Sequence, residues 1–185
     1  MYNDTIHIII HVKGGKVVDK KALHKLTYGL FVISSIKDGK PNGQIANVAF
    51  QVTAKPVNIA IALHKDNLTC EYVKTSHIFS VSILDQTADM LFIGRFGFRS
   101  GRDFNKFDNS INWKTGIIGA PIVLDHTIAY LEAEVKKEID LGSHIMFIGQ
   151  VVDGQVVKDG IPLTYDYYHN VIKGKEPERA PTYNE

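Results

Sequence analysis

The segment Ile128-Ala129-Tyr130-Leu131-Glu132-Ala133-Glu134-Val135-Lys136-Lys137-Glu138 gives the clearest indication of the fold class. Small or apolar residues at 129, 131, 133 and 135 alternate with polar or amphipathic residues at 130, 132, 134 and 136. Side chains on a β-strand point alternately to its two faces, so this spacing predicts a strand with one apolar face. The other face, with Tyr130, Glu132, Glu134 and Lys136, is expected to be wet.

Other short apolar segments on both sides of this strand have the length and composition of further strands. They are residues 28–36, 44–51, 57–63, 78–84, 122–125 and 144–152. Asp38-Gly39, Asn42-Gly43 and Asp153-Gly154 are typical turn dipeptides, the last leading into residues 155–157. Many short strands at regular spacing predict a mainly β protein with a closed or partly closed barrel.

Helical segments are few and short. We expect one at residues 20–26, one that follows Asp66-Asn67 and ends at Thr75, and one that Asp85 caps. The third would run into the loop at residues 96–107.

The composition fits one globular domain with a sizeable core: 185 residues, 44% of them hydrophobic and 22% charged. The net charge of +1 gives no indication of binding to nucleic acid or to an anionic membrane. A single cysteine, Cys70, excludes an internal disulfide and a cysteine-cluster metal site, and we expect no metal centre.

The two ends of the chain have their own compositions. Lys13-Gly14-Gly15-Lys16 is what a purine-rich ribosome-binding site would encode, which suggests that residues 1–18 are an extension outside the native protein. Residues 171–185 are expected to form an extended tail, which leaves residues 19–170 as the domain. No apolar run is long enough to cross a bilayer and the start lacks the features of a signal peptide, so we expect a cytoplasmic protein.

The loop Phe96-Gly97-Phe98-Arg99-Ser100-Gly101-Arg102-Asp103-Phe104-Asn105-Lys106-Phe107 has the composition of an anion site. Three cations, a hydroxyl group and a flexible glycine lie between aromatic residues that can anchor the loop to a core. Such a loop can hold a phosphate. It matches neither the Walker loop nor G-x-G-x-x-G, and a solvated basic turn is the alternative.

No acid–base or nucleophilic set can be assembled from the sequence. Cys70 lies at an expected helix start, where a thiolate would be favoured, but we favour a buried and inert thiol. The carboxylates are scattered. An anion-binding loop without such a set is more natural in a protein that holds a reactive cofactor.

Several motifs in a fixed order resemble the flavin reductase family over residues 19–170. They are Leu26-Thr27-Tyr28-Gly29-Leu30, Asn42-Gly43-Gln44-Ile45-Ala46-Asn47, Gln51-Val52-Thr53-Ala54-Lys55-Pro56, Asn67-Leu68-Thr69, the loop from Phe96 to Asp103, Lys106-Phe107 and His144. The resemblance implies an FMN-binding split β-barrel, Greek-key-like, with a few short peripheral helices. It also implies a homodimer.

The resemblance assigns roles to individual residues. Ser100, Gly101, Arg102 and Lys106 would hold the FMN phosphate, and Asn67 and Thr69 would reach the ribityl chain or the phosphate. Ile45, Ala46, Asn47, Gln51 and Thr53 would border the isoalloxazine ring, and His144 would be the catalytic residue near the nicotinamide. Asn47 as an ordinary strand residue, Gln51 and Thr53 facing solvent, and His144 as a structural barrel-mouth histidine are the alternatives.

The activity implied by the resemblance is that of an NAD(P)H:flavin oxidoreductase. Hydride from NADH or NADPH would pass to FMN, and electrons would pass on to free flavin, ferric iron, oxygen or a rubredoxin-like protein. A non-enzymatic electron carrier of the flavoredoxin type is the main alternative, and an enzyme like pyridoxine-phosphate oxidase fits the motifs less well. Gln44 stands where relatives often have Cys and Cys70 where many have His, so no role is carried over to either.

Overall fold

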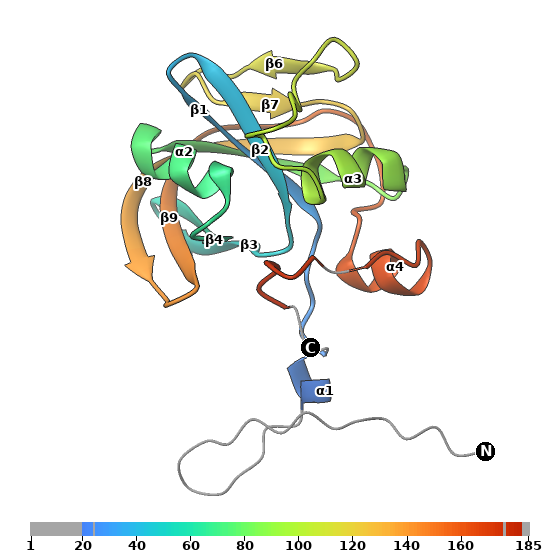
Figure 1. Ribbon diagram of the computed structural model, residues 1–185. Helices are drawn as coiled ribbons and strands as arrows, with labels where there is room; N and C mark the ends of the chain where they lie inside the picture. Colours follow the sequence, from blue (N-terminus) through green and yellow to red (C-terminus); the bar gives the residue numbers. More distant parts are fainter. Residues whose placement is uncertain (1–19, 24, 176, 183–185) are drawn as a thin grey trace, which may run out of the picture.

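The computed structural model describes residues 20–23, 25–175 and 177–182, and the predicted extension at residues 1–18 lies outside them. Seven strands of one sheet, a two-stranded hairpin and four short helices make up this part of the chain (Figure 1). In chain order they are α1 (Lys20–Leu23), β1 (Phe31–Lys37), β2 (Lys40–Ala46), β3 (Ala49–Ala54), β4 (Val57–His64), α2 (Leu68–Ser76), β5 (Ile78–Leu84), α3 (Met90–Gly97), β6 (Trp113–Thr115), β7 (Pro121–Val123), β8 (Thr127–Asp140), β9 (His144–Val156) and α4 (Tyr165–Asn170).

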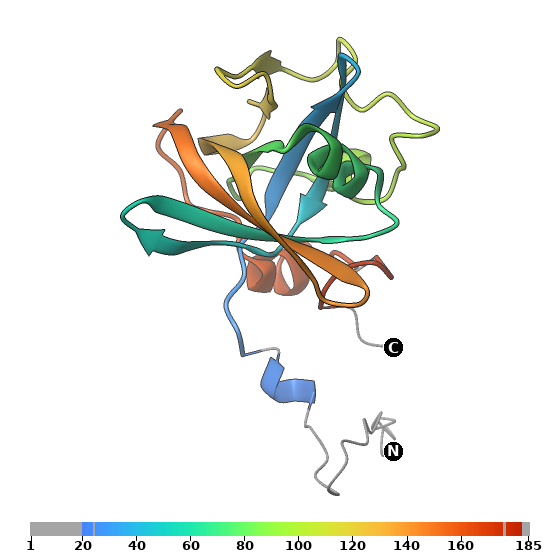
Figure 2. The ribbon, with the colours of Figure 1, turned by 90° about the vertical axis from the view of Figure 1, so that its left-hand side faces the viewer.

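The large sheet is antiparallel throughout and has the strand order β2-β1-β5-β8-β9-β4-β3. Its two end strands, β2 and β3, are joined only by Asn47 and Val48. A two-residue link spans roughly 10 Å, so both ends of the sheet must lie side by side. The sheet is therefore rolled into a barrel that is split between β2 and β3, and Figure 2 shows β8 and β9 crossing β3 and β4. The predicted mainly β, partly closed barrel is confirmed.

Alternation along the strands fills two separate cores. Ile33 of β1 points into the barrel with Phe79, Phe147 and the α2 residues Cys70 and Val73. Val32 points to the outer face, where a second core lies beneath α3 and α4. This outer core includes Leu30, Leu84, Phe92, Phe96, Phe107, Leu163 and Tyr168.

The expectation of a wet face along β8 is wrong for its first half. Tyr130 is 2% exposed, with Lys114 of β6 over its ring, and Glu132 is fully buried beneath the segment that joins β6 to β7. The Glu132 carboxylate accepts hydrogen bonds from the backbone N–H groups of Ile117 (2.9 Å) and Ile118 (3.3 Å). Lys136, farther along the strand, is exposed as expected.

Two of the three predicted turn dipeptides are not turns. Asp38-Gly39 does connect β1 to β2, but Asn42-Gly43 lies within β2 and Asp153-Gly154 within β9. A Cβ atom on Gly43 would lie 2.7 Å from Ser34 Oγ, and one on Gly154 would lie 2.6 Å from Leu131 Cδ2. Both glycines are needed for close packing across the sheet and not for chain reversal.

Other boundaries also differ from the prediction. The expected strand at residues 44–51 is broken at Asn47-Val48, where the barrel is split. Asp89, not Asp85, caps α3 by accepting a hydrogen bond from the Phe92 N–H, whereas Asp85 accepts one from the Thr87 N–H. Asn67 is the N-cap residue of α2 but makes no side-chain cap hydrogen bond. Strand β6 and helix α4 were not predicted.

Candidate functional site

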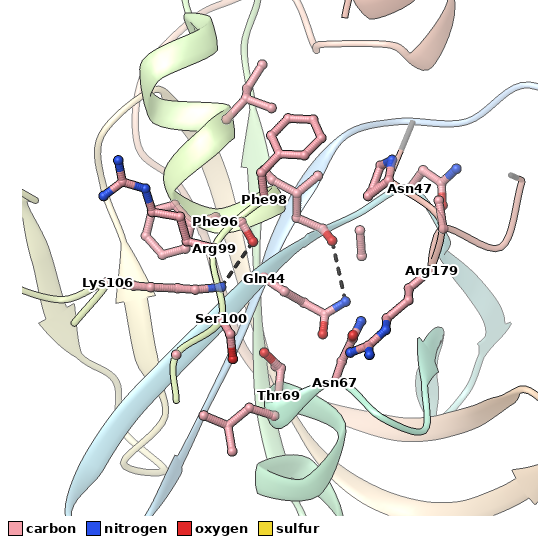
Figure 3. Close-up of a pocket in the computed structure, with 18 of the residues that line it drawn as sticks. Gln44, Asn47, Asn67, Thr69, Phe96, Phe98, Arg99, Ser100, Lys106 and Arg179 are labelled. Carbon is pink, nitrogen blue, oxygen red and sulfur yellow. Dashed lines mark hydrogen bonds between the residues drawn. The ribbon is translucent and has the colours of Figure 1, made fainter. Parts of the chain in front are cut away.

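A cavity of about 590 Å³ lies between β2, the first turn of α2, the end of α3 and the loop that follows α3. Its volume is in the usual range for a cofactor or small-molecule site. Figure 3 shows polar and cationic side chains from these separate elements directed into one space. Of the predicted site residues, Ile45, Ala46, Asn47, Asn67, Thr69, Ser100, Gly101, Arg102 and Lys106 line it.

Lys106 is the most unusual group in the wall, because it is a lysine that is only 5% exposed. Its ammonium group donates hydrogen bonds to the carbonyl oxygens of Gly43 (2.8 Å) and Phe96 (3.2 Å), and no carboxylate among the described residues pairs with it. Burial lowers the pKa of Lys106 to about 8. An ammonium group has three N–H donors, so one remains for a ligand. A buried cation without a counter-ion favours binding of an anion in the cavity.

The first turn of α2 forms another wall of the cavity. Asn42 donates a 2.8 Å hydrogen bond to Thr69 Oγ1 and so ties β2 to this turn. A Cβ atom on Gly101 would lie 2.0 Å from Asn42 Oδ1. The loop comes so close to β2 at this position that only a glycine fits. Because the first N–H groups of a helix lack partners within the helix, this turn adds backbone donors and a positive dipole end.

Hydrogen-bond acceptors gather at the other end of the cavity, along the end of β2. Gln44 Oε1 and Asn47 Oδ1 are buried and have no hydrogen-bond partner among the described residues. The Asn47 amide instead donates to Thr182 Oγ1 at 2.8 Å. Buried acceptors without partners are costly, so a ligand with N–H donors would stabilise this end.

Two arginines lie at the cavity rim on the loop that follows α3. The Arg102 side chain is 54% exposed and pairs with Glu71 at 3.1 Å, and Glu71 also binds Lys37 at 2.6 Å. The hydrogen bond from Lys37, and then the one from Arg102, lower the pKa of Glu71. Arg99, which was counted among the loop cations but not among the site residues, lies over the Phe104 ring at 4.4 Å. The loop is therefore anchored through aromatic contacts.

His144 lies in an adjoining hollow and does not line the main cavity. This His144 hollow, of about 370 Å³, is lined by Ala62, His64, Leu141, Ser143, His144, Glu178, Ala180 and Pro181. The His64 and His144 rings meet edge to face at 5.0 Å, at the paired ends of β4 and β9. Burial, and then the neighbouring His64, lower the pKa of His144, against a backbone hydrogen bond with Arg179. This shift favours the neutral form of the imidazole.

Gln51 and Thr53 lie apart from the cavity of this chain. Both are exposed on the edge strand β3, where Gln51 donates to the Thr53 carbonyl (3.1 Å) and Thr53 donates to the Pro56 carbonyl (2.6 Å). Cys70 is buried in the barrel core, and burial raises the pKa of its thiol to about 11. Burial and the raised pKa both favour the inert alternative for Cys70.

The C-terminal residues 177–182 contribute to the site, which the sequence reading missed. Pro177, Glu178, Arg179, Ala180 and Pro181 line the main cavity. Thr182 anchors them through its hydroxyl group, which is 2.8 Å from both Asn47 Nδ2 and Tyr165 Oη. From the sequence these residues were expected to form an extended tail, with no role in the site.

The described part of the chain contains no group of three or more His, Cys, Asp or Glu placed to hold a metal ion. Among the same residues, no helix is both long and apolar enough to span a membrane.

Comparisons with known proteins agree with the geometry. Residues 23–171 match the flavin reductase like domain. The chain is 48% identical over 168 residues to the ferric-chelate reductase (NAD(P)H) of Archaeoglobus fulgidus, covering 91% of this chain and 99% of the relative. It is 46% identical over 166 residues to the high molecular weight rubredoxin of Moorella thermoacetica, covering 90% and 72% of the two chains.

A solved structure supports the same relationship. Flavin reductase HpaC complexed with NADP+ superimposes with a TM-score of 0.66 at 25% identity, over 79% of this chain and 90% of that chain. The matched domain accounts for the barrel, α2, α3 and the loop with Lys106. On this sequence and structural evidence, the chain belongs to the family of flavin reductase-like domains.

Proposed function

We propose that the protein is an NAD(P)H-dependent flavin reductase that holds FMN in the main cavity. The observation that carries the proposal is the buried ammonium group of Lys106, which has no carboxylate partner among the described residues and faces a cavity of cofactor size. The A. fulgidus relative is named as an NAD(P)H enzyme, and a related structure binds NADP+. When bound, FMN supplies the hydride-accepting centre of the reaction.

The residues at the two ends of the cavity fit the two ends of FMN. Lys106, Arg102, Ser100, Gly101 and the first turn of α2 with Asn67 and Thr69 would hold the phosphate and the ribityl chain. Gln44 and Asn47 offer buried acceptors for the N–H donor of the ring, beside Ile45 and Ala46. This arrangement fixes the flavin by charge at one end and by hydrogen bonds at the other.

His144 would act as a positioning group for the nicotinamide. The neutral imidazole can donate or accept a hydrogen bond without transferring a proton. Its hollow shares Ala62, Glu178, Ala180 and Pro181 with the main cavity, so a second ring-shaped substrate could approach both.

Anaerobic mixing of the FMN-loaded protein with NADH or NADPH tests the proposal. We expect the flavin absorbance near 450 nm to bleach with at least one nucleotide. Bleaching should be complete within seconds, because ordinary enzymes turn over on the order of 1 to 1,000 times per second. Binding of FMN without bleaching by either nucleotide would instead indicate an electron carrier. A protein that binds no FMN would refute both.

We also infer that the protein is a homodimer that uses the β3–β4 hairpin. Phe50, Val52 and Val57 are 51%, 44% and 42% exposed on this hairpin, and β3 is a sheet edge. Exposed apolar residues on an unpaired edge favour association. In such a dimer Gln51 and Thr53 could approach the flavin of the partner.

Light scattering of the FMN-loaded protein at micromolar concentration tests the assembly. We expect twice the chain mass of 20.7 kDa, and a lower mass for the double variant Phe50→Ser/Val52→Ser. A wild-type mass near one chain would contradict the dimer.

The electron acceptor in this proposal is a small iron species or an iron protein. One relative is named a ferric-chelate reductase and another a rubredoxin that extends beyond the matched region. Steady-state rates with ferric citrate, free flavin and rubredoxin, at equal reduced-FMN concentration, would rank the three.

A further inference from the structure

Residues 177–182, which we call the C-terminal strap, lie across the main cavity although the family match ends at residue 171. The strap therefore adds groups to the site that the shared domain does not provide. Its Thr182 hydroxyl group contacts Asn47 and Tyr165, which line the same cavity. A segment held at the cavity in this way can close over a bound cofactor.

Arg179 is the residue of the strap that carries a positive charge. It lines the main cavity but not the His144 hollow, whereas Glu178, Ala180 and Pro181 line both. Figure 3 shows its side chain extending toward Asn67 at the start of α2. No salt bridge to another described residue holds this guanidinium group in place.

Positive groups outnumber negative ones around Arg179, although the carboxylate residues Asp66 and Glu178 also line the cavity. The start of a helix carries a partial positive charge, and Lys106 and Arg102 line the same cavity. Arg102 is already paired with Glu71, whereas no described carboxylate pairs with Lys106 or Arg179, so an anion between these two cations would offset their repulsion. A planar guanidinium group is well suited to bind phosphate oxygens in pairs.

We propose that Arg179 binds the phosphate of FMN and that the C-terminal strap closes the cofactor site through it. The inference rests on the proposed function, because it takes FMN as the ligand of the main cavity. It adds a ligand from outside the family domain, so relatives without this strap would hold the same cofactor with one cation fewer. The strap also contacts Asn47 at the ring end of the cavity. The same segment would therefore affect both the binding of FMN and the access of other molecules to its ring.

The test compares FMN with riboflavin, which has the same ring and ribityl chain but no phosphate. Dissociation constants for both flavins would be measured by fluorescence quenching for the wild type, Arg179→Ala, Arg179→Lys and Lys175→Ala. Lys175 is the matched control, because it is an exposed cation just before the strap and does not line the cavity.

We expect Arg179→Ala to weaken FMN binding by about tenfold, the size of one charge-assisted contact, with riboflavin binding changed less than about twofold. Arg179→Lys should recover part of the loss, and Lys175→Ala should behave as the wild type. Equal weakening of both flavins, or no change in either, would overturn the assignment of the phosphate to Arg179.

Hydrogen exchange of the strap gives a second readout that does not depend on a substitution. FMN should slow amide exchange at residues 178–182 of the wild type more than riboflavin does at equal saturation. Identical protection by both flavins would count against the inference. Wild-type protein that binds neither flavin would refute the proposed function itself, whereas FMN binding that ignores Arg179 would refute only the strap.

Discussion

The two ends of the main cavity are built from opposite chemistry. The cationic end consists of Lys106, Ser100, Arg102 and the first turn of α2, which all offer donors or positive charge. The amide end consists of Gln44 and Asn47, whose buried oxygens have no hydrogen-bond partner in the described part of the chain, and it adjoins the His144 hollow. The charges of the cationic end would contribute to binding of the phosphate and lie away from the reacting ring. The amide end lies beside the hollow where a second substrate would react. The difference suggests that affinity is set at one end and rate at the other.

The largest effect is expected from removing the buried charge at the cationic end. Lys106→Met should weaken FMN binding by about 100-fold, because a charge-assisted hydrogen bond in a low-dielectric site contributes on the order of 3 kcal/mol. The reduction rate of the variant, once saturated with FMN, should stay near the wild-type rate. Fluorescence titration and stopped-flow absorbance measure the two quantities separately.

Thermal unfolding of the apoprotein serves as the control for Lys106→Met. Since Lys106 is buried and hydrogen-bonded to two carbonyl groups, its replacement can change stability, unlike that of an exposed loop lysine. A variant that folds, binds FMN as the wild type does and only reduces slowly would contradict the division between the two ends.

The next effect is expected in the His144 hollow and concerns rate. His144→Ala should retain FMN but reduce it about ten- to a hundredfold more slowly with NAD(P)H, since one positioning contact is worth roughly 1–3 kcal/mol. Stopped-flow reduction of the FMN-saturated variant measures this step.

His77→Asn provides the matched control for His144. His77 is a histidine with a left-handed backbone (φ 57°) at the end of α2 and lies outside both hollows, and asparagine tolerates this conformation. Loss of FMN from His144→Ala would make His144 a cofactor ligand, and an unchanged rate would make it structural.

The smallest effect is expected from the exposed cation of the loop. Arg102→Ala should weaken FMN binding only about threefold, because its side chain is 54% exposed and already paired with Glu71. Glu71→Gln should have the opposite effect and tighten FMN binding slightly, because it releases Arg102 toward the phosphate. Calorimetric titration at low salt measures the FMN affinity of both variants. If Arg102→Ala weakened FMN binding as much as Lys106→Met, the exposure of Arg102 would not explain a smaller contribution to FMN binding.

The features that the sequence predicted well are those encoded locally. The loop at residues 96–107 concentrates cations, a hydroxyl group and glycine in one stretch, and most of its polar residues do line the cavity. Strand β5 was predicted with the bounds that the structure shows, because its apolar run ends at clear breaks. Strand spacing and the flavin reductase resemblance both predicted the barrel, which the sheet topology and the family match confirm.

The features that the sequence predicted poorly depend on contacts between distant segments. Gly43 and Gly154 look like turn residues until the side chains of Ser34 and Leu131 are placed against them. Glu132 looks solvent-exposed until the segment between β6 and β7 supplies two N–H donors. Arg179 lies at the cavity in a segment that Thr182 anchors to Asn47, 135 residues earlier in the chain. Such contacts between residues far apart in the sequence leave no local sequence pattern from which they could be predicted.

Proton uptake on FMN binding tests most directly whether the buried Lys106 ammonium group meets the phosphate. Since burial lowers the pKa of Lys106 to about 8, the group is mostly neutral at pH 8.5 in the apoprotein. A phosphate beside it would raise that pKa, so affinity should be full below about pH 8 and should weaken as the pH rises. Calorimetry at pH 8.5 in buffers of different ionisation enthalpy should show uptake of about half a proton or more per FMN, and none with Lys106→Met. FMN binding by the wild type without proton uptake would contradict the account.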